Sequence, residues 1–216
     1  MISKNFKKRI ITSLFLLSLF ILIFVFNEIL IFSLIIFGVI SIVEFIDITR
    51  KIFNRFLALI ISNLIFVIYV FMFCIITVFF SNILFLKIVY FSLFLSCITS
   101  DIGGYLFGKT FKGPKLTKIS PNKTVSGSIG SLILSCLTFS ISIYFFTNSF
   151  SYINLLIGII TSIGCQMGDL FFSFLKRKAK IKDTGNFFPG HGGVLDRLDG
   201  IFLGIPAGFL AIKFLN

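Results

Sequence analysis

Seven long runs of apolar residues constrain this chain more than any other feature of its sequence. They lie at about residues 10–26, 29–47, 56–79, 83–106, 125–147, 151–175 and 200–215. A helix of about 20 apolar residues crosses the hydrocarbon core of a bilayer. The chain is also 57% hydrophobic, which is well above the usual share for a soluble domain. We therefore predict an all-α, polytopic integral membrane protein with about seven transmembrane helices.

The basic residues fall almost entirely on one side of this arrangement. If the N-terminus is cytoplasmic, the inside segments are 1–9, 48–55, 107–124 and 176–199, and they hold 18 of the 20 Lys and Arg residues. Cytoplasmic loops of membrane proteins collect Lys and Arg. The net charge of +12 is thus explained by topology, and no nucleic-acid partner is expected. The asymmetry predicts a cytoplasmic N-terminus.

The polar residues divide the chain into two regions. Residues 1–80 are predicted to form N-terminal transmembrane helices, and residues 81–216 a catalytic membrane region with cytoplasmic loops 107–124 and 176–199. A transporter would place its unusual polar residues near the bilayer midplane. Here they gather at the inner ends of spans and in the two loops. This pattern predicts a site at the boundary between membrane and cytosol.

Asp101 and Asp169 are the candidate functional carboxylates inside spans. Asp101 opens DIGGYLFGK, and a carboxylate in a span costs roughly 2.5–3.5 kcal/mol, which makes it a functional candidate by default. The alternative is a glycine-rich packing face with a locally paired aspartate. Asp169, Ser173 and Lys176 follow i, i+4, i+7 spacing and share one helix face. We expect this face to hold a divalent metal and a phosphate. The alternative is that the basic residues at its end only fix the orientation of the helix in the membrane.

Asp196 and Asp199 are spaced to share a face if a helix begins near residue 195. With Asp169 they suggest a magnesium site, because Mg²⁺ prefers oxygen ligands and is usually held by one or two carboxylates and substrate phosphates. Helix capping is the alternative. The remaining acidic residues near span ends are expected to be solvated or ion-paired, and the cysteines to be small buried apolar residues. These are Glu28, Glu44 and Asp47, and Cys74, Cys97, Cys136 and Cys165.

Two segments are suited to phosphate binding. Residues 118–130, KISPNKTVSGSIG, combine lysines, hydroxyls and glycines just before a span, where backbone N–H groups bind anions readily. The GxxxxGK[ST] pattern is absent, and an ordinary polar loop is the alternative. Residues 176–183, KRKAKIKD, form a basic juxtamembrane cluster that also attracts anionic lipids.

Residues 173–199, SFLKRKAKIKDTGNFFPGHGGVLDRLD, resemble the signature of phosphatidate cytidylyltransferases, the CDP-diacylglycerol synthases. DIGGYLFGK at 101–109 and SPNKTVSGSIG at 120–130 resemble two upstream elements of that family, in the same order. Ser126 stands where members usually carry an acidic residue, Gly104 where Ala is usual and Lys109 where Arg is usual. The resemblance implies the reaction of CTP with phosphatidate to give CDP-diacylglycerol and pyrophosphate.

The resemblance also implies roles for individual residues. The predicted catalytic residues are Asp169, Lys176, Asp196 and Arg197. The predicted substrate-binding residues are Lys123, Ser173, Arg177, Lys182 and His191. The predicted metal ligands are Asp169, Asp196, Asp199 and Asp101, with Mg²⁺ as the metal. A second cation such as K⁺ and a homodimer are implied by the family alone. His191 is expected to bind a phosphate or to donate to pyrophosphate, with a structural role in its Gly-rich turn as the alternative.

Three other functions compete with cytidylyl transfer. A related membrane polyprenol or phytol kinase would phosphorylate an alcohol and need a base. A lipid transporter would not need a long cytoplasmic loop, and an inactive homologue would not need an intact signature. The complete K-D, H-G-G and D-R-x-D pattern favours the enzyme. We expect a multi-pass protein of the bacterial inner (cytoplasmic) membrane, with phosphatidate and membrane lipid as partners and an active site facing the cytoplasm.

Overall fold

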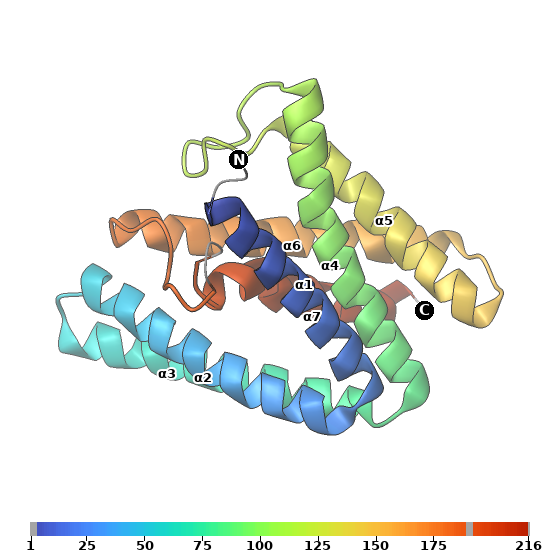
Figure 1. The fold of residues 1–216 in the computed structure, drawn as a ribbon, viewed down its shortest axis with the longest axis horizontal. Helices are drawn as coiled ribbons and strands as arrows, with labels where there is room; N and C mark the ends of the chain where they lie inside the picture. The colour runs from blue at the N-terminus through green and yellow to red at the C-terminus, as the bar shows by residue number, and fades with distance from the viewer. Residues whose placement is uncertain (1–3, 189–191, 216) are drawn as a thin grey trace. The chain divides into compact units, whose positions relative to one another are not determined.

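The chain is all-α in the computed structural model, which describes residues 4–188 and 192–215 (Figure 1). The helices are α1 (Lys4–Val25), α2 (Asn27–Ile52), α3 (Phe56–Ser81), α4 (Leu84–Phe111), α5 (Val125–Thr147), α6 (Tyr152–Lys178) and α7 (Leu195–Leu215). Within those ranges the β-type pairing consists of two isolated bridges, Lys115 with Thr124 and Phe188 with Gly192. The predicted all-α class is confirmed.

Six of the described helices, α2 to α7, are long and apolar enough to cross a membrane. The apolar part of α1, Ile11–Val25, is shorter. Several helices continue beyond the predicted spans, and α2 and α6 carry the basic residues Lys51 and Lys178 in their last turns. A helix does not stop where the hydrocarbon stops, because basic side chains in its last turn interact favourably with the helix dipole. The chain is a polytopic membrane protein.

The described helices form two compact units. The N-terminal unit comprises Met1–Ile83 and Leu175–Leu198, and the C-terminal unit comprises Leu84–Phe174 and Asp199–Asn216. Helices α6 and α7 therefore each contribute residues to both units. The N-terminal unit takes in the loop after α6, which the sequence division at residue 81 assigns to the C-terminal region.

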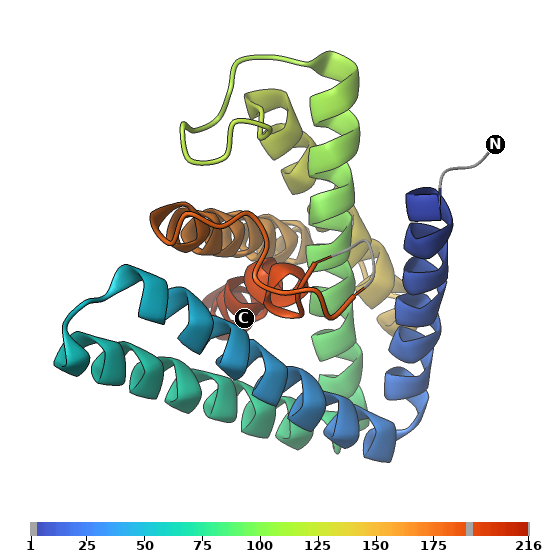
Figure 2. The same ribbon diagram turned by 60° about the vertical axis from the view of Figure 1, so that its left-hand side comes forward.

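In the N-terminal unit, α2 and α3 lie side by side and antiparallel (Figure 2, blue and cyan). Residues 53–55 interrupt the helical pattern, and such a short connection favours antiparallel neighbours. The Phe45 and Phe66 rings stack with their centroids 3.9 Å apart. The Thr49 hydroxyl donates to Asn63 Oδ1 at 2.8 Å. This bond joins the two apolar helices through polar side chains, as interhelical hydrogen bonds do in lipid.

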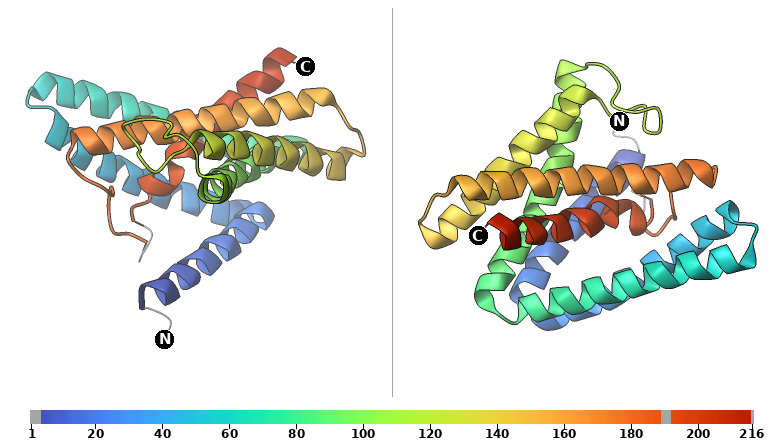
Figure 3. Two further views of the ribbon diagram at one scale, coloured as in Figure 1. Left: turned by 90° about the horizontal axis from the view of Figure 1, so that it is seen from above. Right: turned by 180° about the vertical axis from the view of Figure 1, so that it is seen from behind.

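In the C-terminal unit, glycines bring helix backbones together. A Cβ atom at Gly103 of α4 would lie 2.5 Å from the Gly130 carbonyl oxygen of α5. Helices α6 and α7 also run side by side (Figure 3), and a Cβ at Gly164 would lie 2.6 Å from that of Ala207. Buried hydroxyls join α4, α5 and α6: Ser131 donates to the Ser100 carbonyl at 2.7 Å, and Ser100 and Ser162 share a 2.8 Å bond. Small residues and hydroxyls are the usual means of helix association in lipid.

Candidate functional site

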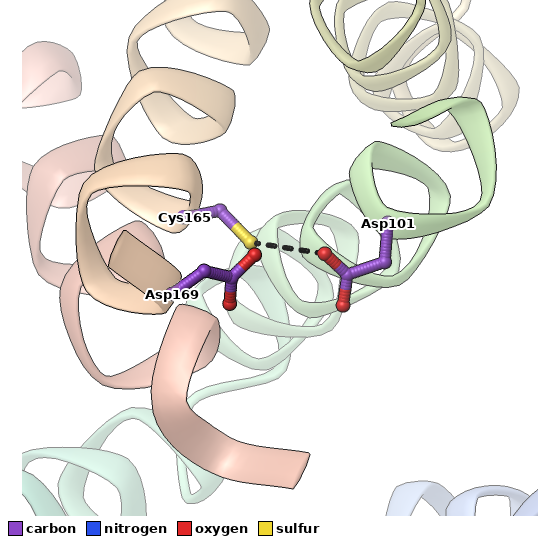
Figure 4. A group of neighbouring side chains, drawn as sticks. All are labelled: Asp101, Cys165 and Asp169. Carbon is purple, nitrogen blue, oxygen red and sulfur yellow. Dashed lines mark hydrogen bonds between the residues drawn. The ribbon is translucent and has the colours of Figure 1, made fainter. Parts of the chain in front are cut away.

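Two carboxylates and a thiol converge in the C-terminal unit (Figure 4). Asp101 comes from α4, while Cys165 and Asp169 lie one turn apart on α6. Their ligand atoms all lie within 4.8 Å of one another. The Cys165 thiol, which is buried, lies 3.9 Å from Asp101 Oδ1. The structure thus brings together two of the four predicted metal ligands.

Cys165 is a member of this cluster that the predicted site residues do not include. The prediction of buried, apolar-like cysteines is confirmed for Cys97 and Cys165, whereas Cys74 and Cys136 are only partly buried. A single cysteine in an apolar run carries no signal of a nearby carboxylate. Its position four residues before Asp169 was the available hint, since i and i+4 lie on the same face of a helix.

The loop before α5 delivers Lys123 to Asp169. The ammonium group of Lys123 lies 2.8 Å from Asp169 Oδ2, with 31% and 16% of the two side chains exposed. Backbone bonds shape the loop: Leu116 N–H donates to the Lys123 carbonyl at 2.8 Å, and Lys123 N–H to the Ser120 carbonyl at 3.0 Å. The structure thus places Lys123, a predicted substrate-binding residue, beside a predicted metal ligand.

Thr124 ends this loop directly before α5. It is the N-cap residue, and its hydroxyl accepts from the Gly127 N–H at 3.1 Å. Such a bond satisfies one of the donors left free at a helix start. Ser126, the departure from the family pattern, donates to the Lys112 carbonyl at 3.3 Å. Its hydroxyl therefore ties the two ends of the loop together in this chain.

The donor set of Asp101 and Asp169 fits a magnesium ion. Mg²⁺ takes oxygen ligands, whereas the softer sulfur of Cys165 suits other metals. Lys123 donates a hydrogen bond to Asp169 Oδ2, and the other oxygen, Oδ1, faces α7. A Cβ at Gly200 would lie 2.7 Å from that oxygen and 2.5 Å from the Cys165 sulfur. Only a glycine on α7 keeps the space beside this carboxylate open.

A second acid–lysine pair lies in the N-terminal unit. Lys176 Nζ is 2.7 Å from Asp196 Oδ1, and only 12% and 8% of the two side chains are exposed. Asp196 Oδ2 accepts from the backbone N–H groups of Thr184 at 2.8 Å and Gly193 at 3.1 Å. The carboxylate therefore fastens the loop to the end of α6 and the start of α7. Each carboxylate oxygen has two lone pairs, so Oδ1 keeps one for a further partner.

Gly192 has to be glycine for this geometry. Its φ of +84° lies in the left-handed region, and a Cβ there would be 2.8 Å from Asp196 Oδ2. Glycine adopts such angles without steric strain. The glycines of the signature therefore let the backbone turn closely around the Asp196 carboxylate.

Glu44 of α2 completes this second cluster, and the structure corrects its predicted environment. The side chain is neither solvated nor paired with a cation among the described residues: it is 7% exposed. It accepts from the Val194 N–H at 3.0 Å, the Leu195 N–H at 2.8 Å and the Thr184 hydroxyl at 2.7 Å. A carboxylate close to Arg50 and Lys51 in sequence suggests an ion pair, but its partners come from 140 to 151 residues further along the chain.

The other predicted residues keep their positions on the expected elements. Helix α6 is continuous through Asp169, Ser173 and Lys176, and α7 begins at Leu195, so Asp196 and Asp199 lie one turn apart on one helix. Asp199 Oδ1 accepts from the Gly200 N–H at 3.0 Å. Ser173 is partly buried, and Arg177, Lys182 and Arg197 are exposed. His191 lies outside the described residues. The roles predicted for these residues stay predictions.

Comparison with known proteins agrees with the signature. A family model described as "Cytidylyltransferase family" matches residues 48–215. The phosphatidate cytidylyltransferase of Mycobacterium leprae is 38% identical over 127 residues, which cover 58% of this chain and 40% of that protein. That of Rickettsia felis is 42% identical over 125 residues, covering 52% of this chain and 54% of the relative. That of Staphylococcus haemolyticus is 41% identical over 115 residues, which cover 52% of this chain and 44% of the relative.

The matched part of the chain spans about half the length of these relatives. The family match itself covers most of the chain, including both acid–lysine pairs, Lys123 with Asp169 and Lys176 with Asp196. It also includes all three sequence elements on which the resemblance depends. The resemblance is thereby confirmed, and the chain belongs to the cytidylyltransferase family.

Proposed function

We propose that this protein transfers the cytidylyl group of CTP to phosphatidate, giving CDP-diacylglycerol and pyrophosphate for phospholipid synthesis. The observation that carries the proposal is the family match over residues 48–215, whose relatives are named phosphatidate cytidylyltransferases. The two acid–lysine pairs are consistent with it, because a reaction among several phosphate groups needs cationic side chains and carboxylates that can hold a metal.

The reaction needs positioning and charge screening more than proton transfer. A phosphate oxygen of phosphatidate attacks the α-phosphorus of CTP, the new P–O bond forms, and the bond to the β-phosphate oxygen breaks to release pyrophosphate. The attacking phosphate monoester has a second pKa of about 6 and is largely ionised at neutral pH. No side chain therefore has to act as a general base, which leaves His191 free for phosphate binding.

Asp101 and Asp169 are the residues that would hold Mg²⁺ in the C-terminal unit. When bound, the metal would screen the triphosphate and the charge that develops during transfer. Lys123, which already lies at Asp169, would bind the nucleotide phosphates. Asp196 and Asp199 stay predicted as further metal ligands, and a second cation such as K⁺ stays an expectation from the family.

The basic residues of the signature would bind the substrates' phosphates. Lys176 and Arg197 are assigned to the reacting phosphates, and Arg177 and Lys182 to substrate binding with the Ser173 hydroxyl. Arg177 and Lys182 are exposed and can attract an anionic headgroup. Lys176 is paired with Asp196, so its charge is held at a fixed place and does not have to be ordered when substrate binds.

The setting of the enzyme is also a proposal. The protein would lie in the bacterial cytoplasmic membrane with its N-terminus and its active site facing the cytoplasm, where CTP is available. Its charge asymmetry supports this orientation. We also propose a homodimer, which the family resemblance implies.

A labelled-nucleotide assay tests the proposal and separates it from a kinase. The purified protein in detergent is incubated with phosphatidate, Mg²⁺ and CTP labelled at either the α- or the γ-phosphorus. We expect lipid-linked label from α-labelled CTP and labelled pyrophosphate from γ-labelled CTP. Lipid-linked γ-label, with a polyprenol or phytol supplied as acceptor, would instead show a kinase. No lipid-linked label from protein that elutes as a folded species would overturn the enzyme claim.

A further inference from the structure

We propose that Glu44 of α2 is a positioning residue for the signature loop, acting through Thr184 on the Asp196 carboxylate. Glu44 precedes the segment that the family model matches, which begins at residue 48. The inference rests on the proposed function, because that function is what makes Asp196 part of the catalytic machinery. Every residue that carries it belongs to the N-terminal unit.

The first part of the inference concerns the start of α7. The first N–H groups of a helix have no partner within the helix. A polar residue just before the helix usually supplies one, but the residues before Leu195 are Gly192, Gly193 and Val194. The Glu44 carboxylate takes the place of such a cap. Its Oε1 accepts from Val194 N–H at 3.0 Å, and its Oε2 accepts from Leu195 N–H at 2.8 Å.

The loop is built to admit this carboxylate. A Cβ at Gly193 would lie 2.5 Å from both Glu44 oxygens, and a Cβ at Gly185 would lie 2.5 Å from Oε1. Removing a carboxylate from water is unfavourable unless it is well hydrogen-bonded. Glu44 is 7% exposed and accepts three bonds, so its burial is compensated only while the loop keeps this conformation.

Thr184 connects Glu44 to Asp196. Its hydroxyl lies 2.7 Å from Glu44 Oε2 and 3.1 Å from Asp196 Oδ2, and its N–H donates to Asp196 Oδ2 at 2.8 Å. A hydroxyl has one hydrogen and donates to one acceptor at a time. The two carboxylates are therefore held around one residue: the Thr184 N–H holds Asp196 Oδ2, while its hydroxyl lies between Asp196 and Glu44.

Paired substitutions test this role in the full-length protein in detergent. Glu44→Gln keeps the shape but puts an NH₂ group against backbone donors, and Thr184→Val removes the hydroxyl. We expect each to lower kcat by about 10- to 100-fold, as loss of partners around metal-binding carboxylates typically does. Thr184→Ser keeps the hydroxyl and should stay within about twofold of the parent. Asp47→Asn, an exposed carboxylate on the same helix, should leave kcat unchanged.

Hydrogen–deuterium exchange gives a readout that does not depend on activity. Without substrate or metal, peptides covering residues 184–196 should exchange faster in Glu44→Gln and Thr184→Val than in Thr184→Ser. If CTP turnover is absent from the parent, the proposed function fails while this comparison still tests the positioning. Equal activity and exchange in Thr184→Val and Thr184→Ser would overturn the role of Thr184 as the link. Unchanged exchange in folded Glu44→Gln would overturn the role of Glu44.

Discussion

At the scale of single residues, Lys123 and Lys118 differ in whether they contact a carboxylate. Both lie in the loop before α5, but Lys123 is bonded to Asp169, whereas Lys118 is exposed and lines a shallow depression with Lys115. We expect Lys123→Met to lower kcat/KM for CTP by about 10- to 100-fold, because a cation beside the proposed metal ligand Asp169 is lost. Lys118→Met should change it by less than about threefold. Initial rates over a range of CTP concentrations measure both.

The comparison between these lysines also tests the alternative that the loop is merely polar. Two lysines that act only by raising the local concentration of anions would have similar, salt-sensitive effects. Equal losses in Lys123→Met and Lys118→Met would therefore contradict a specific role for Lys123. An effect confined to Lys123 would support the assignment.

At the scale of elements, the α4–α5 packing depends on contact between backbones. Gly103→Ala would place a methyl group 2.5 Å from the Gly130 carbonyl oxygen, where a backbone has to move. We expect a loss of about 1–3 kcal/mol in the free energy of unfolding, the usual range for overpacking. Gly38→Ala is the matched control, because its Cβ would meet Val70 at an ordinary 3.4 Å. Thermal unfolding in detergent should show a lower Tm for Gly103→Ala and little change for Gly38→Ala.

The helices were largely predictable because apolar length and flanking charge act locally. The expected span 125–147 coincides with α5. Helix α7 begins at Leu195, five residues before the expected span 200–215 and at the start that would let Asp196 and Asp199 share a face. The ends of α2 and α6 were less predictable, since basic turns beyond the hydrocarbon stay helical. The hydropathy of a segment shows which residues can lie in the hydrocarbon core, but it does not show at which residue the helix ends.

The sequence singles out the residues of the two acid–lysine pairs, but it does not predict which of them meet. Lys123 and Asp169 are 46 residues apart and Lys176 and Asp196 are 20 apart, so spacing does not show which acid meets which base. Glu44 had one signal in the sequence: the residues before α7, Gly-Gly-Val, offer no side-chain cap. A helix start without a local acceptor requires one from elsewhere in the fold.

At the scale of the whole molecule, the distribution of charge predicts the orientation in the membrane. Of the 20 basic residues, 18 lie in segments that are on the same side if the N-terminus is cytoplasmic. Single cysteines at Lys112 and Ser149, both exposed, would lie on opposite sides in that topology, because α5 separates them. The native cysteines are first replaced, so that labelling reports only the introduced residue.

A membrane-impermeant maleimide applied to intact cells then measures the orientation. We expect Ser149→Cys to be labelled in intact cells and Lys112→Cys only after permeabilisation. The reverse pattern would show that the basic loops face outward, where CTP is not available, and would contradict the proposed cytoplasmic active site. Because the two labelled positions flank α5, the result depends only on whether α5 crosses the membrane and in which direction. It does not depend on how the two compact units are arranged.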